Sequence, residues 1–550
     1  MTYRALLLCP PLLFLSLSLR PLWSQTPQDR MDQVLDRIIA REHEFLQVIR
    51  ERRPLIETYV QENSAAGGGP VSDHYFLGRF RLSDQVSYGS LVERPDTPAL
   101  KNAKPGSRAS KMPLFAFLPR GFAQMAAIDL RDFNRQTYHF EYVRREFLGE
   151  VRCLVFDVTP INRRASGRFL GRIWVEDQGY AIVRFNGVFF AAPSVKGQVP
   201  ERFFHFDSWR VNASAALWVP AQIYIEEQGA EGNIPRFRAQ SRIWDYDAIP
   251  SGRLDELTNV LVESQAPVKD KEGPPDFSPL EGRRAWERQA EENLVARLEK
   301  GGLLAPPGPV DQVVNTVLEN LIVSGNLNVE ARARVLLTTP METFAIGHTI
   351  VISRGLIDVL PDEASLAVIL AGELSHIALG HPTPTQFAFN DQTMLSDAEM
   401  LQRFRFQRSP EEVRAAGEKA IQLIHASPYK SAGSAGLFLK ALASRRNTLA
   451  QLLDANLGDR LAEPALLDLF KEWTAAAPAL DDRKLEQIPA LPLGSRIRLN
   501  PWNNQIALVK TRPLALLSPS EKMPFEIAPI ELYLTHASPG IETRLGTAEK

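Results

Sequence analysis

The chain has almost no cysteine and no surplus of charge of either sign. Its 550 residues include only Cys9 and Cys153, and Cys9 lies in an N-terminal apolar run that we expect to be removed. A single remaining cysteine cannot form an internal disulfide, so the fold must be stable without one. The alternating residues around Cys153 predict a buried strand position. The 63 Lys and Arg residues nearly balance the 65 Asp and Glu residues, which argues against nucleic acid as a partner.

Beyond its N-terminus, the sequence also lacks any apolar run long enough to span a bilayer, which takes about 20 residues. Residues 1–25 begin with Arg4 and continue with an apolar stretch from Ala5 to Leu19. This pattern is typical of a secretory signal peptide. We therefore predict an exported chain, periplasmic or secreted, with no transmembrane segment after cleavage. An uncleaved membrane anchor is the alternative.

Two periodicities divide the first half of the chain. Residues 26–66 carry apolar side chains at helical spacing and predict an amphipathic helical segment that bends or restarts at Pro54. From 67 to 250 the apolar period changes to two, with turns such as Gly149-Glu150 between the runs. Consecutive hairpin strands imply one large, curved antiparallel sheet. The expected strands lie at 138–143, 151–156, 168–176, 180–186, 216–226 and 236–246.

The segment "GRFLGRIWVEDQGYAIVRFNG" (167–187) resembles the sheet of LolA/LolB-like lipoprotein carriers, and the resemblance extends over residues 71–250. It implies an open half-barrel that wraps around a lipid chain, and therefore a lipid or lipoprotein partner. The alternative is an ordinary core, in which the aromatic side chains of the sheet pack against the N-terminal helix.

The second half returns to helical spacing. Residues 251–309 are proline-rich and predict a linker that contains a charged helix over 279–300. Residues 310–480 predict a mainly helical domain, and residues 481–550 a short C-terminal β segment with a loose tail from 537. The expected strands of this half lie at 335–338, 344–346, 349–353, 496–499, 505–508 and 527–534. The fold class is therefore α+β.

One short motif carries most of the chemical information. In H-E-x-x-H, two histidines one helical turn apart bind zinc, and the glutamate between them acts on the metal-bound water. Residues 368–382 read "VILAGELSHIALGHP", in which Glu373 and His376 are present but Gly372 stands at the first histidine. The motif therefore indicates a peptidase helix that has lost a ligand.

The surroundings of the motif resemble the gluzincin zinc metallopeptidases that include HtpX and the CAAX prenyl protease, over residues 310–440. The features that match in order and spacing are Phe344-Ala345, Gly355-Leu356, Asp362-Glu363, Glu373, His376 and His381. The resemblance implies a gluzincin-like metallopeptidase domain after the curved sheet domain, with zinc as its cofactor and protein or peptide as its partner.

The same resemblance assigns roles to individual positions. Glu373 is the residual general base and His376 the residual ligand, while the hairpin residues Phe344, Ala345 and His348 face substrate. A third ligand is expected on a later helix, four residues before an aspartate. The best register places Val413 and Gly417 at these two positions, which leaves two of three ligands missing. Because Glu411, Glu412 and Glu418 are nearby, other registers stay open.

Other residues offer little replacement. A helix turns 100° per residue, so His376 and His381 are expected to lie about 140° apart and not to share a metal. Without zinc, Glu373 is expected to pair with an arginine such as Arg354, and Gly372 to permit the close approach of another segment.

Three hypotheses about function follow. The leading one is an exported pseudopeptidase with a degenerate zinc site, inactive in hydrolysis and used for binding or scaffolding in the cell envelope. The alternatives are an active zinc endopeptidase with a rearranged ligand set, and a lipid or lipoprotein carrier.

Overall fold

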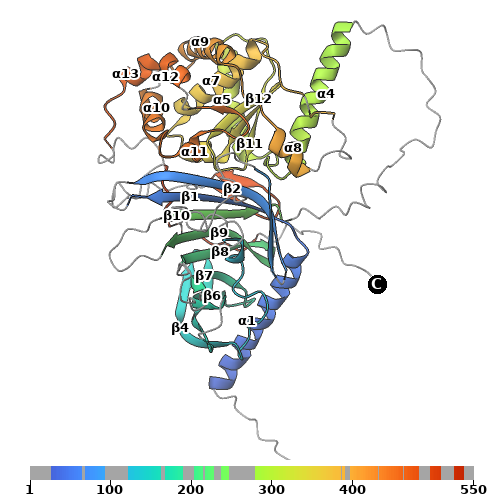
Figure 1. Ribbon diagram of the computed structural model, residues 1–550, viewed down its shortest axis with the longest axis vertical. Coiled ribbons are helices and arrows are strands. Elements are labelled where there is room, and N and C mark those ends of the chain that lie inside the picture. Colours follow the sequence, from blue (N-terminus) through green and yellow to red (C-terminus); the bar gives the residue numbers. More distant parts are fainter. Residues whose placement is uncertain are drawn as a thin grey trace, which may run out of the picture.

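The computed structural model describes most of the chain, and Figure 1 shows its two parts, a sheet below and a mainly helical part above. The expected signal peptide, the part of the expected linker before residue 279 and the tail beyond residue 537 lie outside the described residues. Among the residues that are described, no helix is long and apolar enough to cross a membrane. The described ranges are 27–64, 69–83, 85–92, 122–162, 167–189, 204–214, 217–227, 237–246, 279–385, 387–389, 397–430, 433–461, 464–481, 496–508, 525–529 and 531–537.

The N-terminal segment is a helix followed by a strand. Helix α1 (Pro27–Arg50) has the predicted amphipathic form, but the prediction that the helical segment continues beyond Pro54 is wrong, because β1 (Leu55–Asn63) is a strand. Pro54 cannot continue the helix, and Thr58, Tyr59 and Val60 are residue types that favour strands. The segment therefore belongs to the sheet.

The predicted antiparallel sheet is present and has ten strands in the order β3-β2-β1-β10-β9-β8-β7-β6-β5-β4. All its pairs are antiparallel, and register shifts between several pairs supply the irregularities that bend a sheet. Its other strands are β2 (Pro70–Leu82), β3 (Val86–Ser90), β4 (Tyr138–Leu148), β5 (Val151–Pro160), β6 (Phe169–Glu176), β7 (Ile182–Phe189), β8 (Phe204–Ser214), β9 (Leu217–Glu227) and β10 (Phe237–Trp244). Cys153 is fully buried on β5, as predicted.

The aromatic side chains of the sheet form one core with α1. Phe156, Phe169 and Phe185 belong to the same buried cluster as Ile38 and Phe45 of α1. Arg210 of β8 crosses this core and donates to both carboxylate oxygens of Glu42 on α1, at 2.6 and 2.7 Å. Both side chains of this ion pair are buried, so the helix is fixed to the sheet by charge as well as by apolar packing.

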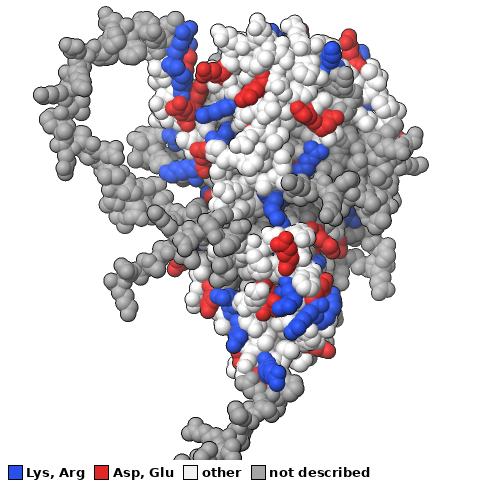
Figure 2. All heavy atoms as spheres, turned by 180° about the vertical axis from the view of Figure 1, so that it is seen from behind, with Lys and Arg blue, Asp and Glu red and all other residues white. Residues whose placement is uncertain are grey.

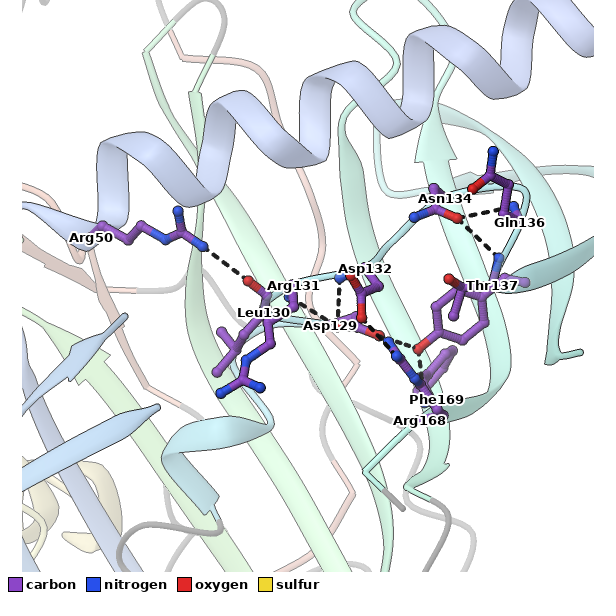
Figure 3. Close-up of polar contacts among 11 residues, drawn as sticks. Arg50, Asp129, Leu130, Arg131, Asp132, Asn134, Gln136, Thr137, Arg168 and Phe169 are labelled. Carbon is purple, nitrogen blue, oxygen red and sulfur yellow. Dashed lines mark hydrogen bonds and ion pairs between the residues drawn. The ribbon is translucent and has the colours of Figure 1, made fainter. Parts of the chain in front are cut away.

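A polar cluster fixes the segment that leads into β4 (Figure 3). The Asp129 carboxylate accepts hydrogen bonds from the Tyr138 hydroxyl and the Arg168 guanidinium, each at 2.6 Å, and from the backbone of Arg131 and Asp132. Burial raises the pKa of Asp129, but these hydrogen bonds outweigh burial and lower it overall. The cluster therefore stabilises the segment with an ionised carboxylate.

The mainly helical part surrounds a small four-stranded sheet of order β11-β13-β12-β14. The charged helix predicted over 279–300 is present as α4, and the predicted strands at 344–346 and 349–353 are β12 and β13. The elements are α4 (Pro279–Lys300), α5 (Pro309–Ser324), β11 (Arg332–Leu336), β12 (Glu342–Ile346), β13 (Thr349–Ser353), α6 (Arg354–Val359), α7 (Glu363–Ala378), α8 (Asp397–Arg403), α9 (Pro410–Ala426), α10 (Gly433–Arg445), α11 (Ala450–Leu453), β14 (Asp459–Arg460), α12 (Pro464–Leu469) and α13 (Lys471–Ala476).

The C-terminal segment contains one hairpin, β15 (Ile497–Leu499) with β16 (Ile506–Leu508). The strand predicted at 527–534 is wrong, since the described residues of this stretch form no strand. They are held by single contacts instead, such as Ile527 N donating to the Gln61 side chain at 2.8 Å and Glu150 N to the Leu534 carbonyl at 2.9 Å.

Buried charges connect the two parts. Glu57 of β1 accepts from the Thr339 hydroxyl at 2.7 Å and from Arg354 Nη2 at 3.1 Å. Its register neighbour Arg242 on β10 lies 4.0 Å from the Asp358 carboxylate. On the outer surface, by contrast, basic and acidic side chains are interspersed on the face shown in Figure 2, as expected from the balanced composition.

Candidate functional site

The helix that carries the motif is defined by its two ends. Asp362 caps the N-terminus of α7, because its side chain accepts from Ser365 N at 2.9 Å. Gly380 follows the helix with a φ of +69°, a left-handed conformation that glycine adopts without strain, and it ends the helix. Between these ends α7 packs against β12 and β13 and against α5, α9 and α10. The motif therefore lies inside the helical part.

A cavity of about 200 Å³ lies beside α7. Gly372, Glu373 and His376 line it from α7, and Val413 and Gly417 line it from α9. The structure thus brings together the motif and the two positions that the sequence register assigned to the later helix. The remaining lining residues are Thr343, Val368, Ile369, Gln407, Arg408, Pro410, Ala416, Leu439, Asp459, Leu461 and Phe470.

Gly372 faces open space. Apart from its chain neighbours and the backbone of its own helix, a Cβ built on Gly372 would meet no described atom within 4 Å. The expectation that glycine permits a close approach here is therefore wrong, and packing leaves room for a side chain. Gly417 is different, because a Cβ there would lie 2.3 Å from Leu469 Cδ1 of α12.

Glu373 is buried, and its Oε2 has no hydrogen-bond partner within the described structure. Burial, helped by the nearby Asp459 carboxylate and opposed by Arg408, raises the pKa of Glu373 to about 8. The expected pairing with Arg354 is wrong, since Arg354 binds Glu57 at the junction with the large sheet. Glu373 is thus a buried carboxyl group that retains its proton at neutral pH and faces a cavity.

His376 and His381 meet, although helical geometry predicted that they would not. Their Nδ1 atoms lie 2.9 Å apart, and their rings are 5.0 Å apart between centroids. The prediction of a 140° separation is wrong because the helix ends at Ala378, and the turn at Gly380 brings His381 back over His376. Burial, with Arg408 and His381, lowers the pKa of His376 to about 3, so its ring is neutral.

Two charged side chains at the cavity were not predicted. Arg408 donates from its guanidinium to the Pro382 carbonyl and to the Ala345 carbonyl of β12. Its backbone N–H donates to Asp459 Oδ1 at 2.7 Å. Neither residue belongs to a motif, and both lie far along the chain from Glu373, so local sequence patterns carry no signal for them.

The three residues expected to face substrate are placed differently from one another. Phe344 is fully buried and stacks on Phe406 with a centroid distance of 4.9 Å, so it belongs to the core. Ala345 is buried and contributes its carbonyl to Arg408. His348 is exposed and lies 3.3 Å from Glu291 of α4. None of the three lines the cavity.

The residues of this cavity do not fit a catalytic zinc ion. Such a site takes three protein ligands and keeps a fourth position for water. Gly372 and Val413 have no ligand atom, and His376 Nδ1 contacts His381. Within the described ranges, no group of three or more His, Cys, Asp and Glu side chains is arranged to share an ion.

Comparison with known proteins supports the family resemblance of the helical part. Residues 310–484 match the model of Peptidase family M48. The match begins in α5, ends beyond α13 and contains the whole cavity lining. The resemblance to zinc metallopeptidases predicted for this region is therefore confirmed, for less than half of the chain. A comparison with curated proteins gave no match.

Three solved structures resemble part of the chain, with low overall scores. A DUF1329 family protein from Desulfovibrio piger is 13% identical over 39% of this chain and 92% of its own, with a TM-score of 0.24. A putative outer membrane lipoprotein-sorting protein domain from Vibrio parahaemolyticus is 11% identical over 38% and 92%, with a TM-score of 0.21. The MucA/MucB complex of Pseudomonas aeruginosa is 10% identical over 38% and 93%, with a TM-score of 0.14. TM-scores of this size carry no conclusion about the fold, a ligand or a partner.

Proposed function

We propose that this chain is an exported pseudopeptidase, in which a peptidase-family domain with a degenerate zinc site binds a protein or peptide partner in the cell envelope and does not hydrolyse it. Support for export comes from the signal-like residues 1–25, and support for the family from the match over 310–484.

The observation that carries this proposal is the chemistry of the cavity wall. The positions of a zinc site are assembled on α7 and α9, and only His376 among them has a side chain that can bind the metal. Burial raises the pKa of Glu373, and a protonated carboxyl group opposes the proton transfer from water that the family's glutamate performs. The architecture of the site is kept while its reactive groups are lost.

The contact between His376 and His381 favours the alternative of an active zinc endopeptidase with a rearranged ligand set. The two imidazole nitrogens now contact each other, so an ion held by both would have to replace that contact and find a third ligand. Stoichiometric zinc in the purified chain, together with peptide cleavage that stops on chelation, would establish this alternative and refute the pseudopeptidase.

Restoring the missing ligands tests the proposal directly. In the double variant Gly372→His with Val413→Glu, the new imidazole has room beside His376, and the new carboxylate faces the same cavity. We expect this variant to bind zinc stoichiometrically in calorimetry, whereas the wild-type chain does not. Gly372→Gln with Val413→Gln is the matched control, with similar bulk and no strong ligand. A folded double variant that binds no zinc would show that the assigned ligand positions are wrong.

A further inference from the structure

The outer edge of β12 is occupied by the chain itself. Residues 456–461, called the strap from here on, place Asp459 and Arg460 opposite Thr343 and Glu342 as the two-residue strand β14. β14 is the outermost strand of the four-stranded sheet, and it comes from a segment more than a hundred residues after β12. An edge strand presents unpaired backbone groups that accept an added strand, and here the strap supplies it.

The strap is held by one carboxylate and one close backbone contact. Glu342 Oε2 accepts from the backbone of Asn456 at 2.9 Å, Leu457 at 2.8 Å and Gly458 at 3.4 Å. A Cβ on Gly458 would lie 2.3 Å from the Thr343 carbonyl oxygen, so only glycine allows the strap to approach β12 this closely. These contacts localise the attachment of the strap to a short stretch.

The same strap forms one wall of the cavity. Asp459 and Leu461 line the cavity together with Glu373, and the Asp459 carboxylate accepts from Arg408 N. Leu457 is buried, and its carbonyl accepts from Phe406 N at 2.7 Å. Removing the strap would therefore open the cavity along β12.

The segment just before the strap is held by the large sheet. Two amides of α11, which ends two residues before the strap, donate to Asp73 of β2: Gln451 N and Leu452 N each lie 2.8 Å from its carboxylate. The Leu452 carbonyl in turn accepts from Met341 N, next to β12. A side chain of the ten-stranded sheet thus fixes the point where the strap begins.

We propose that the strap is a displaceable closure of the cavity and that the ten-stranded sheet controls it through Asp73. A strand of two residues has few ladder hydrogen bonds, so it opens at lower cost than the core of the sheet it joins. A partner that binds the large sheet and withdraws Asp73 would loosen α11 and the strap. The inference concerns access to the cavity and holds whether or not the site binds zinc.

A cysteine in the cavity reports its opening. Ala416 is buried and lines the cavity from α9, and the natural Cys153 is buried in the large sheet. In the full chain with Cys9→Ser and Ala416→Cys, we expect Gly458→Ala to raise the rate of labelling by iodoacetamide about tenfold, because the added Cβ expels the strap. Asp73→Asn should raise the rate about threefold, because a neutral amide binds the two amides of α11 less strongly.

The control is Gly282→Ala on α4, where a Cβ meets no atom of the described residues within 4 Å, and it should leave the rate unchanged. An unchanged rate in folded Gly458→Ala would overturn the closure, and an unchanged rate in Asp73→Asn would overturn control by the large sheet. If Gly458→Ala does not fold, hydrogen exchange on the native chain decides. The amides of residues 456–458 should then exchange faster than those of β13, and equal protection would refute the proposal. Neither readout involves zinc or cleavage, so failure here is distinct from failure of the proposed function.

Discussion

Replacing Glu373 by glutamine should stabilise the helical part of the molecule, and the gain should grow with pH. The folded-state pKa of Glu373 is raised from its ordinary 4.5 to about 8, chiefly by burial. Below pH 4.5 both the folded and the unfolded chain hold the proton, so the contribution of this group to stability is fully present. As the pH rises toward 8, the unfolded chain releases the proton and the folded chain keeps it, and stability is lost.

The size of the effect follows from the same values. One pKa unit corresponds to about 1.4 kcal/mol, so at pH 7 the lost free energy of unfolding is about 3 kcal/mol, and above pH 8 it reaches about 5 kcal/mol. Glutamine has no proton to release. The free energy of unfolding of Glu373→Gln should therefore be close to that of the wild type at pH 4 and exceed it by about 3 kcal/mol at pH 7.

Hydrogen exchange of the α7 amides measures this difference in the right part of the molecule, because it reports opening of the helix independently of the large sheet. Wild type and variant are compared at each pH from 5 to 8. The exposed Glu411 provides the control, since Glu411→Gln should leave the pH profile of α7 unchanged. A difference between Glu373→Gln and wild type that stays constant over this range would show that the buried carboxyl does not hold its proton, and the argument would fail.

Two further perturbations address the large sheet. Glu42→Ala leaves Arg210 charged and unpaired in the core, so we expect a loss of about 3–5 kcal/mol in the free energy of unfolding by urea, and a loss below 1 kcal/mol would show that the ion pair is not buried in solution. Asp129→Asn should lower stability by about 1–2 kcal/mol at pH 7. Because the pKa of Asp129 is lowered in the folded chain, its contribution to stability is present above about pH 4 and disappears as the pH falls further. The thermal unfolding temperatures of variant and wild type should therefore converge in acid. A difference that persists there would contradict this assignment.

Periodicity and turn residues predicted most of the elements, because their cause is local. The predicted strands of the large sheet correspond to β4 to β7, β9 and β10, whereas β2, β3 and β8 were not predicted individually. Helix α7 follows its cap and its terminal glycine. Two errors have a different cause. Residues 55–62 are apolar at spacings that also suit a helix, and only pairing with β2 and β10 makes them a strand. Residues 527–534 alternate like a strand but find no partner strand in the described structure.

The site was predictable only as far as its motif. The sequence register assigned Glu373, His376 and Val413 to one site, and all three line the cavity. The strap and Arg408 reach the same cavity through tertiary contacts, which the spacing of residues in the sequence does not predict. The contact between His376 and His381 was missed for a more specific reason. Helical geometry was extended past Ala378, where the chain already turns.

The order of the large sheet has a consequence for how the chain folds as it is made. Strands β4 to β10 pair in sequence as local hairpins, whereas β1 must wait for β10, since Leu55 pairs with Trp244. Such a long-range pairing is slow, and it forms only after the intervening chain has emerged. The pairing of β1 with β10, which forms last, places Glu57 beside Arg242. In the helical part, Glu57 contacts Arg354 and Arg242 contacts Asp358. Docking of the C-terminal half thus follows completion of the N-terminal half, which gives the newly made chain an order of assembly.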